Sequence, residues 1–181
     1  GGKARLFWSG GELAYYGRAT SLSNGRLNLA ATTVGNYALF SGGRVSSNDT
    51  HSKIVDAYNK SLTRSIPTEL SYGRQLHAAA AVGNYALFAG GYGSDRLSSV
   101  DAYNASLTKT AANNLSIARR YHAAAAIGDY ALFGGGNATD SAYSSVVDSY
   151  DTSLVRKTET PLSTARHSLA ATAIGDYALF G

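Results

Sequence analysis

The chain has no cysteine and no methionine, and only two prolines and one tryptophan among its 181 residues. The lack of cysteine excludes a disulfide framework, a thiol nucleophile and any zinc or iron–sulfur site with cysteine ligands. Its apolar runs are far shorter than the roughly 18 residues that a membrane-spanning helix requires. We therefore expect neither a membrane partner nor a cofactor. The composition is compatible with an intracellular protein and with a secreted or surface protein, with a slight preference for the latter.

Charge of one sign is also not concentrated anywhere in the chain. Sixteen Lys and Arg residues stand against 12 Asp and Glu, which gives a net charge of +4, but the basic residues are spread singly. Such scatter is typical of a solvated surface and not of a nucleic-acid interface. We therefore expect no nucleic-acid partner.

What the sequence has instead is an internal repeat, which must be identified before any fold is assigned. A phrase of the form Gly-Asn/Asp-Tyr-Ala-Leu-Phe recurs at steps of 48, 45 and 47 residues, beginning at Gly35, Gly83, Gly128 and Gly175. Leu-Ser and then an arginine precede each copy, at Arg26, Arg74, Arg119 and Arg166, and Asp-Ala/Ser-Tyr follows three copies, at Asp56, Asp101 and Asp148. We divide the chain into units 22–69, 70–114 and 115–161, with a fourth unit made of residues 1–21 and 162–181.

Each unit reads as four short strands. An Ala-rich segment such as 77–82 leads through Gly-Asn or Gly-Asp into Tyr-Ala-Leu-Phe. A Gly-led two-residue link is typical of a hairpin, because glycine accepts the positive φ of primed turns. A double glycine ends the second strand, the third strand carries Val-Asp-Ala-Tyr with alternating apolar and polar positions, and a Thr-rich fourth strand such as 107–110 follows. Four strands at this period match the blade of a β-propeller, so we expect an all-β fold with few helices.

The phrase Arg-x-x-His-Ala-Ala-Ala-x-x-Gly-x-Tyr-Ala-Leu-Phe-x-Gly-Gly, followed by Val-Asp-Ala-Tyr, resembles the kelch repeat. Gly91 and Tyr103 are separated by 11 residues, the usual gap of that family, whereas the tryptophan that normally follows the tyrosine is replaced by Ser65, Thr110 and Lys157. The resemblance implies a propeller of four-stranded antiparallel blades, with four kelch-like units in this chain. It does not imply one mechanism, because kelch propellers serve many functions.

The two ends of the chain bear on whether the units close into a ring. The segments 3–8 and 13–16 are candidates for a third and a fourth strand, and the chain stops after a first and a second strand at Phe180-Gly181. We expect residues 1–20 to supply the outer strands of the blade begun by residues 166–181, which would pair an exposed strand edge. The alternative is that the chain is part of a longer ring, or that chains associate to complete one.

The large aromatic side chains of the second strands should pack between units. We expect this of the four tyrosines Tyr37, Tyr85, Tyr130 and Tyr177 and of the four phenylalanines Phe40, Phe88, Phe133 and Phe180. Burying one such ring contributes on the order of 1.5–3 kcal/mol.

Length variation identifies one face of the fold as the candidate binding face. Each repeated Arg lies nine residues before its turn Gly, and Tyr58, Tyr103 and Tyr150 lie sixteen residues before the next repeated Arg. Only the distance from turn Gly to Tyr varies, as 23, 20 and 22 residues, so the variation lies in the connections 44–53, 92–98 and 137–144 between strands two and three. Variable loops on a rigid scaffold commonly carry binding.

These connections hold polar groups beside aromatic rings, a combination that suits sugars, peptides and other polar ligands, although loops are also polar because they are solvated. The candidate ligand-binding residues are Asn48, Asp49, His51, Tyr92, Asp95, Arg96, Asn137, Asp140 and Tyr143.

The repeated charged residues and histidines have two interpretations each. Arg26, Arg74, Arg119 and Arg166 can form a cationic ring that holds an anion, but their strict repetition favours hydrogen bonds to a loop carbonyl or to the repeated Asp. The spacing of His51, His77, His122 and His167 matches no metal-binding motif, so we expect no metal site. For His77 and His122 we favour a hydrogen-bonded structural role, the alternative being that they approach each other at the axis.

The leading functional hypothesis is a non-enzymatic binding or scaffold module that presents its variable loops to a glycan or a protein. We assign no catalytic residue. The enzyme alternative is a carbohydrate-active hydrolase or lyase that uses Asp49, His51 and Asp95 on the same face. A third alternative is an assembly unit or fragment of a larger propeller, either monomeric or self-associating to complete a ring.

Overall fold

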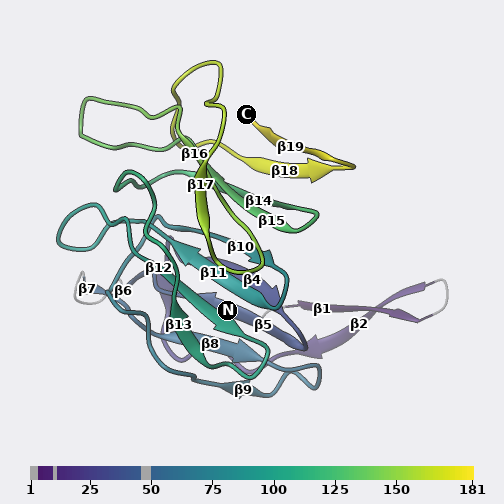
Figure 1. Cartoon of the computed structure of the whole chain (residues 1–181). Coiled ribbons are helices and arrows are strands. Elements are labelled where there is room, and N and C mark those ends of the chain that lie inside the picture. The colour runs from purple at the N-terminus through teal and green to yellow at the C-terminus, as the bar shows by residue number, and fades with distance from the viewer. Residues whose placement is uncertain (1–3, 10–11, 46–49) are drawn as a thin grey trace.

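The computed structural model describes residues 4–9, 12–45 and 50–181, and over these residues the chain forms strands and no helix. The strands lie in antiparallel sheets (Figure 1). Three sheets have four strands each, in chain order, so that each of these sheets lies within one sequence unit. The prediction of an all-β fold with repeated four-stranded antiparallel sheets is confirmed.

The first of these sheets, in unit 22–69, contains β4 (Ala30–Val34), β5 (Tyr37–Ser41), β8 (Val55–Tyr58) and β9 (Arg64–Ser65). The second, in unit 70–114, contains β10 (Ala78–Val82), β11 (Tyr85–Ala89), β12 (Val100–Asn104) and β13 (Lys109–Ala111). The third, in unit 115–161, contains β14 (Ala123–Ile127), β15 (Tyr130–Gly134), β16 (Val147–Tyr150) and β17 (Arg156–Thr158).

The remaining strands form smaller sheets. Two hairpins pair β1 (Ala4–Ser9) with β2 (Glu12–Arg18) and β18 (Ala171–Ile174) with β19 (Tyr177–Phe180). A three-stranded sheet contains β3 (Arg26–Leu27), β6 (Arg44–Val45) and β7 (Thr50–His51). None of the described residues belongs to a helix that could cross a membrane.

The double glycine at the end of each second strand ties one unit to the next. Gly90 and Gly91 have φ values of 63° and 99°, which other residues rarely adopt. A Cβ atom on Gly90 would lie 2.8 Å from the carbonyl oxygen of Arg119, in the following unit. The close approach lets Gly91 N–H donate to that same oxygen at 2.9 Å, and the bonds from Gly43 to Arg74 and from Gly136 to Arg166 repeat it at 2.7 and 2.8 Å.

The core lies between neighbouring sheets. Phe88 and Tyr103 are fully buried and pack edge to face at 5.9 Å between ring centroids. They belong to one buried cluster with Leu39, Val55 and Ala57 of the first sheet. The second and third sheets meet in the same way, through a cluster that contains Leu87, Ala102, Phe133 and Tyr150. The prediction that Phe88 and Phe133 are core residues is confirmed.

The burial of the second and third strands does not follow the sequence pattern. Apolar and polar residues alternate in the third strands, but β8 and β16 are buried at every position and β12 at every position except Asn104, because the aspartate is paired inside the molecule. Tyr130 and Tyr177 are 43% and 72% exposed, so they do not pack between units as we expected, whereas Tyr37 and Tyr85 pack against the core. Tyr130 and Tyr177 both line the groove between the third sheet and the two-stranded sheet β18–β19.

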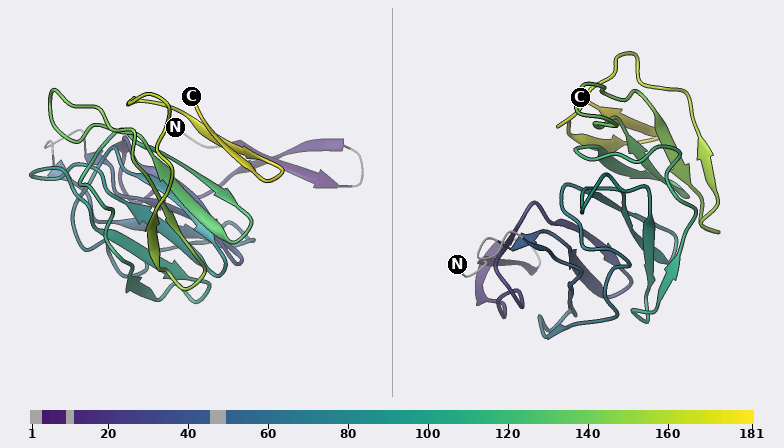
Figure 2. Two further views of the ribbon diagram at one scale, coloured as in Figure 1. Left: turned by 45° about the horizontal axis from the view of Figure 1, so that its top comes forward. Right: turned by 90° about the vertical axis from the view of Figure 1, so that its left-hand side faces the viewer.

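The expected closure of the ring is not present among the described residues. β1 pairs with β2, and β18 and β19 form a sheet of two strands, so residues 1–20 do not complete the blade begun by residues 166–181. The sheets form an open arc (Figure 2). One physical reason is that the segment after β2 is tied to the first sheet, where Tyr58 Oη donates to the Thr20 carbonyl at 2.8 Å and Ser23 N–H donates to Asp56.

Candidate functional site

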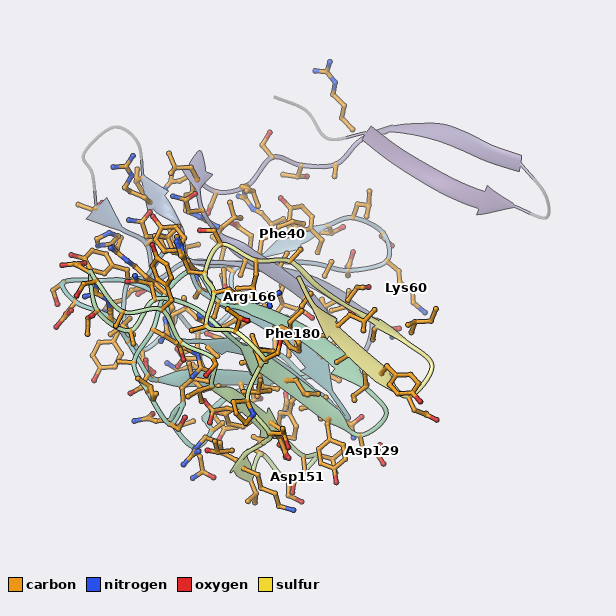
Figure 3. The ribbon with its side chains drawn as sticks, turned by 90° about the horizontal axis from the view of Figure 1, so that it is seen from above. Phe40, Lys60, Asp129, Asp151, Arg166 and Phe180 are labelled. Atoms are coloured by element: carbon orange, nitrogen blue, oxygen red, sulfur yellow. The ribbon has the colours of Figure 1, made fainter. Side chains whose placement is uncertain are left out.

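The connections between second and third strands gather on one side of the molecule (Figure 1). Each forms a small hairpin that pairs back onto the residues just after a repeated arginine. In the first unit this is the sheet β3-β6-β7, in the second Tyr92 bridges Gln75 and Arg96, and in the third Asn137 bridges Arg120 and Tyr143. The short turns lie on the other side, where Lys60, Asp129 and Asp151 are labelled in Figure 3. We call the surface formed by the connections between second and third strands the loop face.

At the first junction on the loop face, His51 contacts the next unit. Its Nε2 atom lies 3.1 Å from Nε2 of Gln75, and its ring packs edge to face on Tyr92 at 5.7 Å. The side chain of Gln75 also accepts a hydrogen bond from Asn28 Nδ2 at 3.0 Å. These polar side chains are therefore held by each other before any ligand arrives.

At the second junction, arginines from two units converge on one carboxylate. Arg96 donates to Asn137 Oδ1 at 3.1 Å and to Asp140 Oδ1, and Arg120 Nη2 lies 3.4 Å from the same Asp140 oxygen. The Asp140 side chain is 87% exposed, whereas that of Arg96 is 13% exposed. An accessible carboxylate is thus presented on a base of two ordered guanidinium groups.

Aromatic rings pack against the Arg120 guanidinium. The Arg120 guanidinium lies 4.7 Å from the ring centroid of Tyr92 and 5.3 Å from that of Tyr121. Tyr121 in turn contacts His167 at 6.0 Å, and His167 contacts Tyr143 at 4.3 Å. Tyr143 is 54% exposed and Tyr121 is 37% exposed, so aromatic surface remains open to solvent beside Asp140.

The structure thus joins most of the candidate residues into one network: His51, Tyr92, Arg96, Asn137, Asp140 and Tyr143. Asp95 is exposed and interacts with its neighbour Arg96. Asn48 and Asp49 lie outside the described residues.

Four members of the network were not predicted: Gln75, Arg120, Tyr121 and His167. A signal for all four exists in the sequence. The two positions directly after the repeated arginine differ in every unit, as Leu27-Asn28, Gln75-Leu76, Arg120-Tyr121 and His167-Ser168, while the arginine itself repeats. Variation beside a constant residue of the repeat indicates positions that are free to differ between units.

The repeated arginines occupy a different place. Arg26, Arg74 and Arg119 form ion pairs of 2.8, 2.8 and 2.9 Å with Asp56, Asp101 and Asp148, and their side chains have no exposed surface. Burial lowers the pKa of Arg74 and Arg119, and the facing aspartates oppose that shift. Buried guanidinium groups that are already paired cannot form a cationic ring that holds an anion. These three side chains therefore have the structural role that their repetition favoured. Arg166 differs from them, because its half-buried side chain has no such partner among the described residues.

His77 and His122 lie inside the molecule, one in each of two neighbouring units. His77 Nε2 lies 2.8 Å from Ser41 Oγ, which supports the predicted structural role of this residue. Neither ring nitrogen of His122 has a hydrogen bond of good geometry, so the predicted hydrogen-bonded role is not seen for this residue, although the backbone of Ala89 is close enough to oppose the pKa shift of the ring. Burial, and then the positive charge of Arg119, lower the pKa of His122 to about 3, and burial likewise lowers that of His77. Both rings are therefore neutral near pH 7, and no metal-binding cluster is present in the described part of the chain.

Comparison of the chain with protein-family models and with curated proteins found no match.

Proposed function

We propose that the four-stranded sheets are blades of a kelch-like propeller and that the chain is a binding module whose loop face takes a glycan. The fold part of this proposal is supported by the three sheets of identical strand order and by the radial arrangement of the sheets in Figure 2. The functional part rests on one observation. Exposed aromatic rings and an exposed carboxylate belong to one network of side chains contributed by neighbouring units.

The chemistry of this network suits a carbohydrate. Asp140 offers acceptors for sugar hydroxyls, and Arg96 and Arg120 hold that carboxylate in place. Tyr143 and Tyr121 offer apolar ring faces against which a pyranose can stack. Because the polar side chains are already fixed by their mutual hydrogen bonds, little conformational entropy is lost when a ligand binds.

The experiment is a glycan-array screen of the full chain, followed by calorimetric titration of the best oligosaccharide. Tyr143→Ala and Asp140→Ala should each weaken binding at least about tenfold, the loss expected for one stacked ring or one charged hydrogen bond. Tyr177→Ala is the matched control, since Tyr177 is an exposed tyrosine at the start of β19, next to a short turn and away from the loop face. Equal loss in Tyr143→Ala and Tyr177→Ala, or no glycan bound at all, would contradict the proposal, and a protein captured only when Tyr143 is intact would favour the protein ligand instead.

The carbohydrate-active enzyme remains the second hypothesis. It requires His51 to act with Asp49 or Asp95, but His51 is engaged by Gln75 and Tyr92 in the structure. Turnover of a polysaccharide by the purified chain, lost in His51→Ala and retained in Tyr143→Ala, would favour it over the binding module.

A further inference from the structure

The β18–β19 hairpin carries the same first and second strands as the three larger sheets but has no third strand among the described residues. In those sheets the second strand pairs on its outer edge with a strand of sequence Val-Asp-Ala/Ser-Tyr, and the register places Phe40, Phe88 and Phe133 opposite Asp56, Asp101 and Asp148. β19 repeats the sequence Tyr-Ala-Leu-Phe, and it pairs with β18 alone. Its outer edge therefore presents unpaired backbone groups.

The last unit also contains the two residues that bind the aspartate carboxylate of the third strand in the complete units. In the second unit the carboxylate of Asp101 accepts hydrogen bonds from Ser71 and from Arg74, and in the third unit Asp148 is held by Ser116 and Arg119. Ser163 and Arg166 are the corresponding residues of the last unit.

Arg166 is aimed at the free edge of the hairpin. Its guanidinium donates to the carbonyl oxygens of Phe180 and Thr164 at 3.3 Å each and has no carboxylate partner among the described residues. Figure 3 shows Arg166 and Phe180 next to each other. The arginine thus lies where its counterparts form buried ion pairs.

A groove in the structure matches the tyrosine of the missing strand. In the complete units, Tyr103 and Tyr150 fill the space over the preceding sheet and are fully buried there. The equivalent space over the third sheet is empty and is lined by Leu132, Val147 and Ser149 on one side and by Ala178 and Phe180 on the other. Thr160 lies at its end. The hydroxyl groups of Tyr103 and Tyr150 donate to the carbonyls of Thr68 and Asn113, which occupy the position of Thr160 in their units.

The hairpin at the start of the chain does not fit these two receptors. β1 has the sequence Ala-Arg-Leu-Phe-Trp-Ser, which contains no carboxylate to neutralise Arg166 and no tyrosine hydroxyl. β2 contains Glu12, Tyr15 and Tyr16, but no carboxylate stands two residues before a tyrosine. An occupant must supply a carboxylate and, two residues later, a tyrosine, because the side chains of residues i and i+2 lie on the same face of a strand.

We propose that β19 binds, by antiparallel strand addition, an extended Asp-x-Tyr segment of the same repeat type. Main-chain hydrogen bonds to β19 supply affinity, and the Ser163–Arg166 pair and the groove at Thr160 supply specificity, as in other cases of strand addition. In the register of the complete sheets, the aspartate lies opposite Phe180 and the tyrosine opposite Ala178.

The test uses the full chain and a fluorescein-labelled peptide with the sequence of its own residues 97–112, which span a third and a fourth strand. Fluorescence anisotropy should show saturable binding. A peptide with Asp101→Asn should bind at least about tenfold more weakly, since it loses hydrogen bonds to a charged group. A Tyr103→Ala peptide should also bind more weakly, because it leaves the groove empty. Both changes are made in the peptide, so neither can unfold the protein.

The chain variant Arg166→Gln identifies the receptor. It should weaken the unmodified peptide as much as the Asp101→Asn change does, and the two changes together should cause no further loss, because they remove the same contact. Arg18→Gln is the control for charge, since Arg18 is an exposed arginine at the end of β2. The absence of saturable binding up to millimolar peptide, or equal affinity for the Asp101→Asn peptide, would overturn the proposal. A stable dimer in light scattering that does not bind the peptide would also overturn the proposal. The edge of β19 would then be covered by a second copy of the chain, whose own Asp-x-Tyr strands are already paired within their sheets.

Discussion

Replacing His122 by leucine should make the protein less sensitive to acid. His122 is buried, its two ring nitrogens have no hydrogen-bond partner, and its ring lies against Phe133 at 6.2 Å. Leucine fits the same position, because Leu169 occupies it in the last unit. A Cβ atom on Gly135 would lie 3.0 Å from Leu169, and one on Gly90 would lie 2.8 Å from His122.

The magnitude follows from the lowered pKa. Burial first, and then Arg119, lower the pKa of His122 from 6.5 to about 3. Between these two values the unfolded chain binds a proton that the folded chain does not, so the free energy of unfolding falls as the pH falls. At about pH 5 the loss attributable to His122 is about 2 kcal/mol relative to neutral pH, since each pH unit below the unfolded pKa of about 6.5 removes about 1.4 kcal/mol. His77, whose pKa burial also lowers, adds to the loss in the same direction.

The assay is urea unfolding followed by far-ultraviolet circular dichroism at several pH values between about 4.5 and 7.5, with linear extrapolation to water. His122→Leu should show a stability loss between pH 7.5 and pH 5 that is smaller than that of the unmodified chain by about 2 kcal/mol. It should also be more stable at neutral pH by about 1 kcal/mol or more, because two unsatisfied polar atoms leave the core. His167→Leu, on the loop face, is the matched control. Parallel pH curves for the unmodified chain and His122→Leu would refute the reasoning.

Two further substitutions test the packing between units. Phe88→Ala should lower the free energy of unfolding by about 3–5 kcal/mol, because Phe88 is fully buried between two sheets, and a loss below about 1 kcal/mol in urea unfolding would contradict that packing. Gly90→Ala should lower it at least twice as much as Gly128→Ala. Both glycines have positive φ, but a Cβ on Gly90 meets the Arg119 carbonyl at 2.8 Å whereas one on Gly128 meets nothing within 4 Å. Gly128→Ala therefore measures the cost of the left-handed backbone alone, about 1–2 kcal/mol, and equal melting temperatures for the two variants would mean that the clash is relieved.

The strands themselves were predictable because every unit repeats the same local signals. A Gly-led turn with positive φ and a second strand ended by two glycines occur where the sequence placed them. Small differences remain at strand ends. The fourth strand of unit 70–114 begins at Lys109 instead of Leu107, because Leu107 takes a φ of 61° in the turn.

Features that depend on distant partners were less predictable. The burial of Asp101 in strand three follows from Arg74, 27 residues earlier, and the sequence alone left that arginine with two interpretations. Ring closure depends on pairing between the ends of the chain, which no local pattern specifies. In the candidate site, Arg120 and His167 were missed because the prediction followed loop length, whereas these residues lie directly after the repeated arginine, where the sequence varies but the length does not.

The hydrogen bonds from the second glycine of each pair to the next unit fix how neighbouring units are oriented. Arg74 and Arg119 each bind an aspartate of their own unit through the side chain and accept a hydrogen bond from the preceding unit through the carbonyl oxygen, and the carbonyl of Arg166 accepts the same bond from Gly136. The rotation between neighbours is therefore set by contacts that recur at every boundary, as in proteins whose repeats interact only with adjacent repeats. Insertion or deletion of a whole unit would then lengthen or shorten the arc and leave its curvature unchanged.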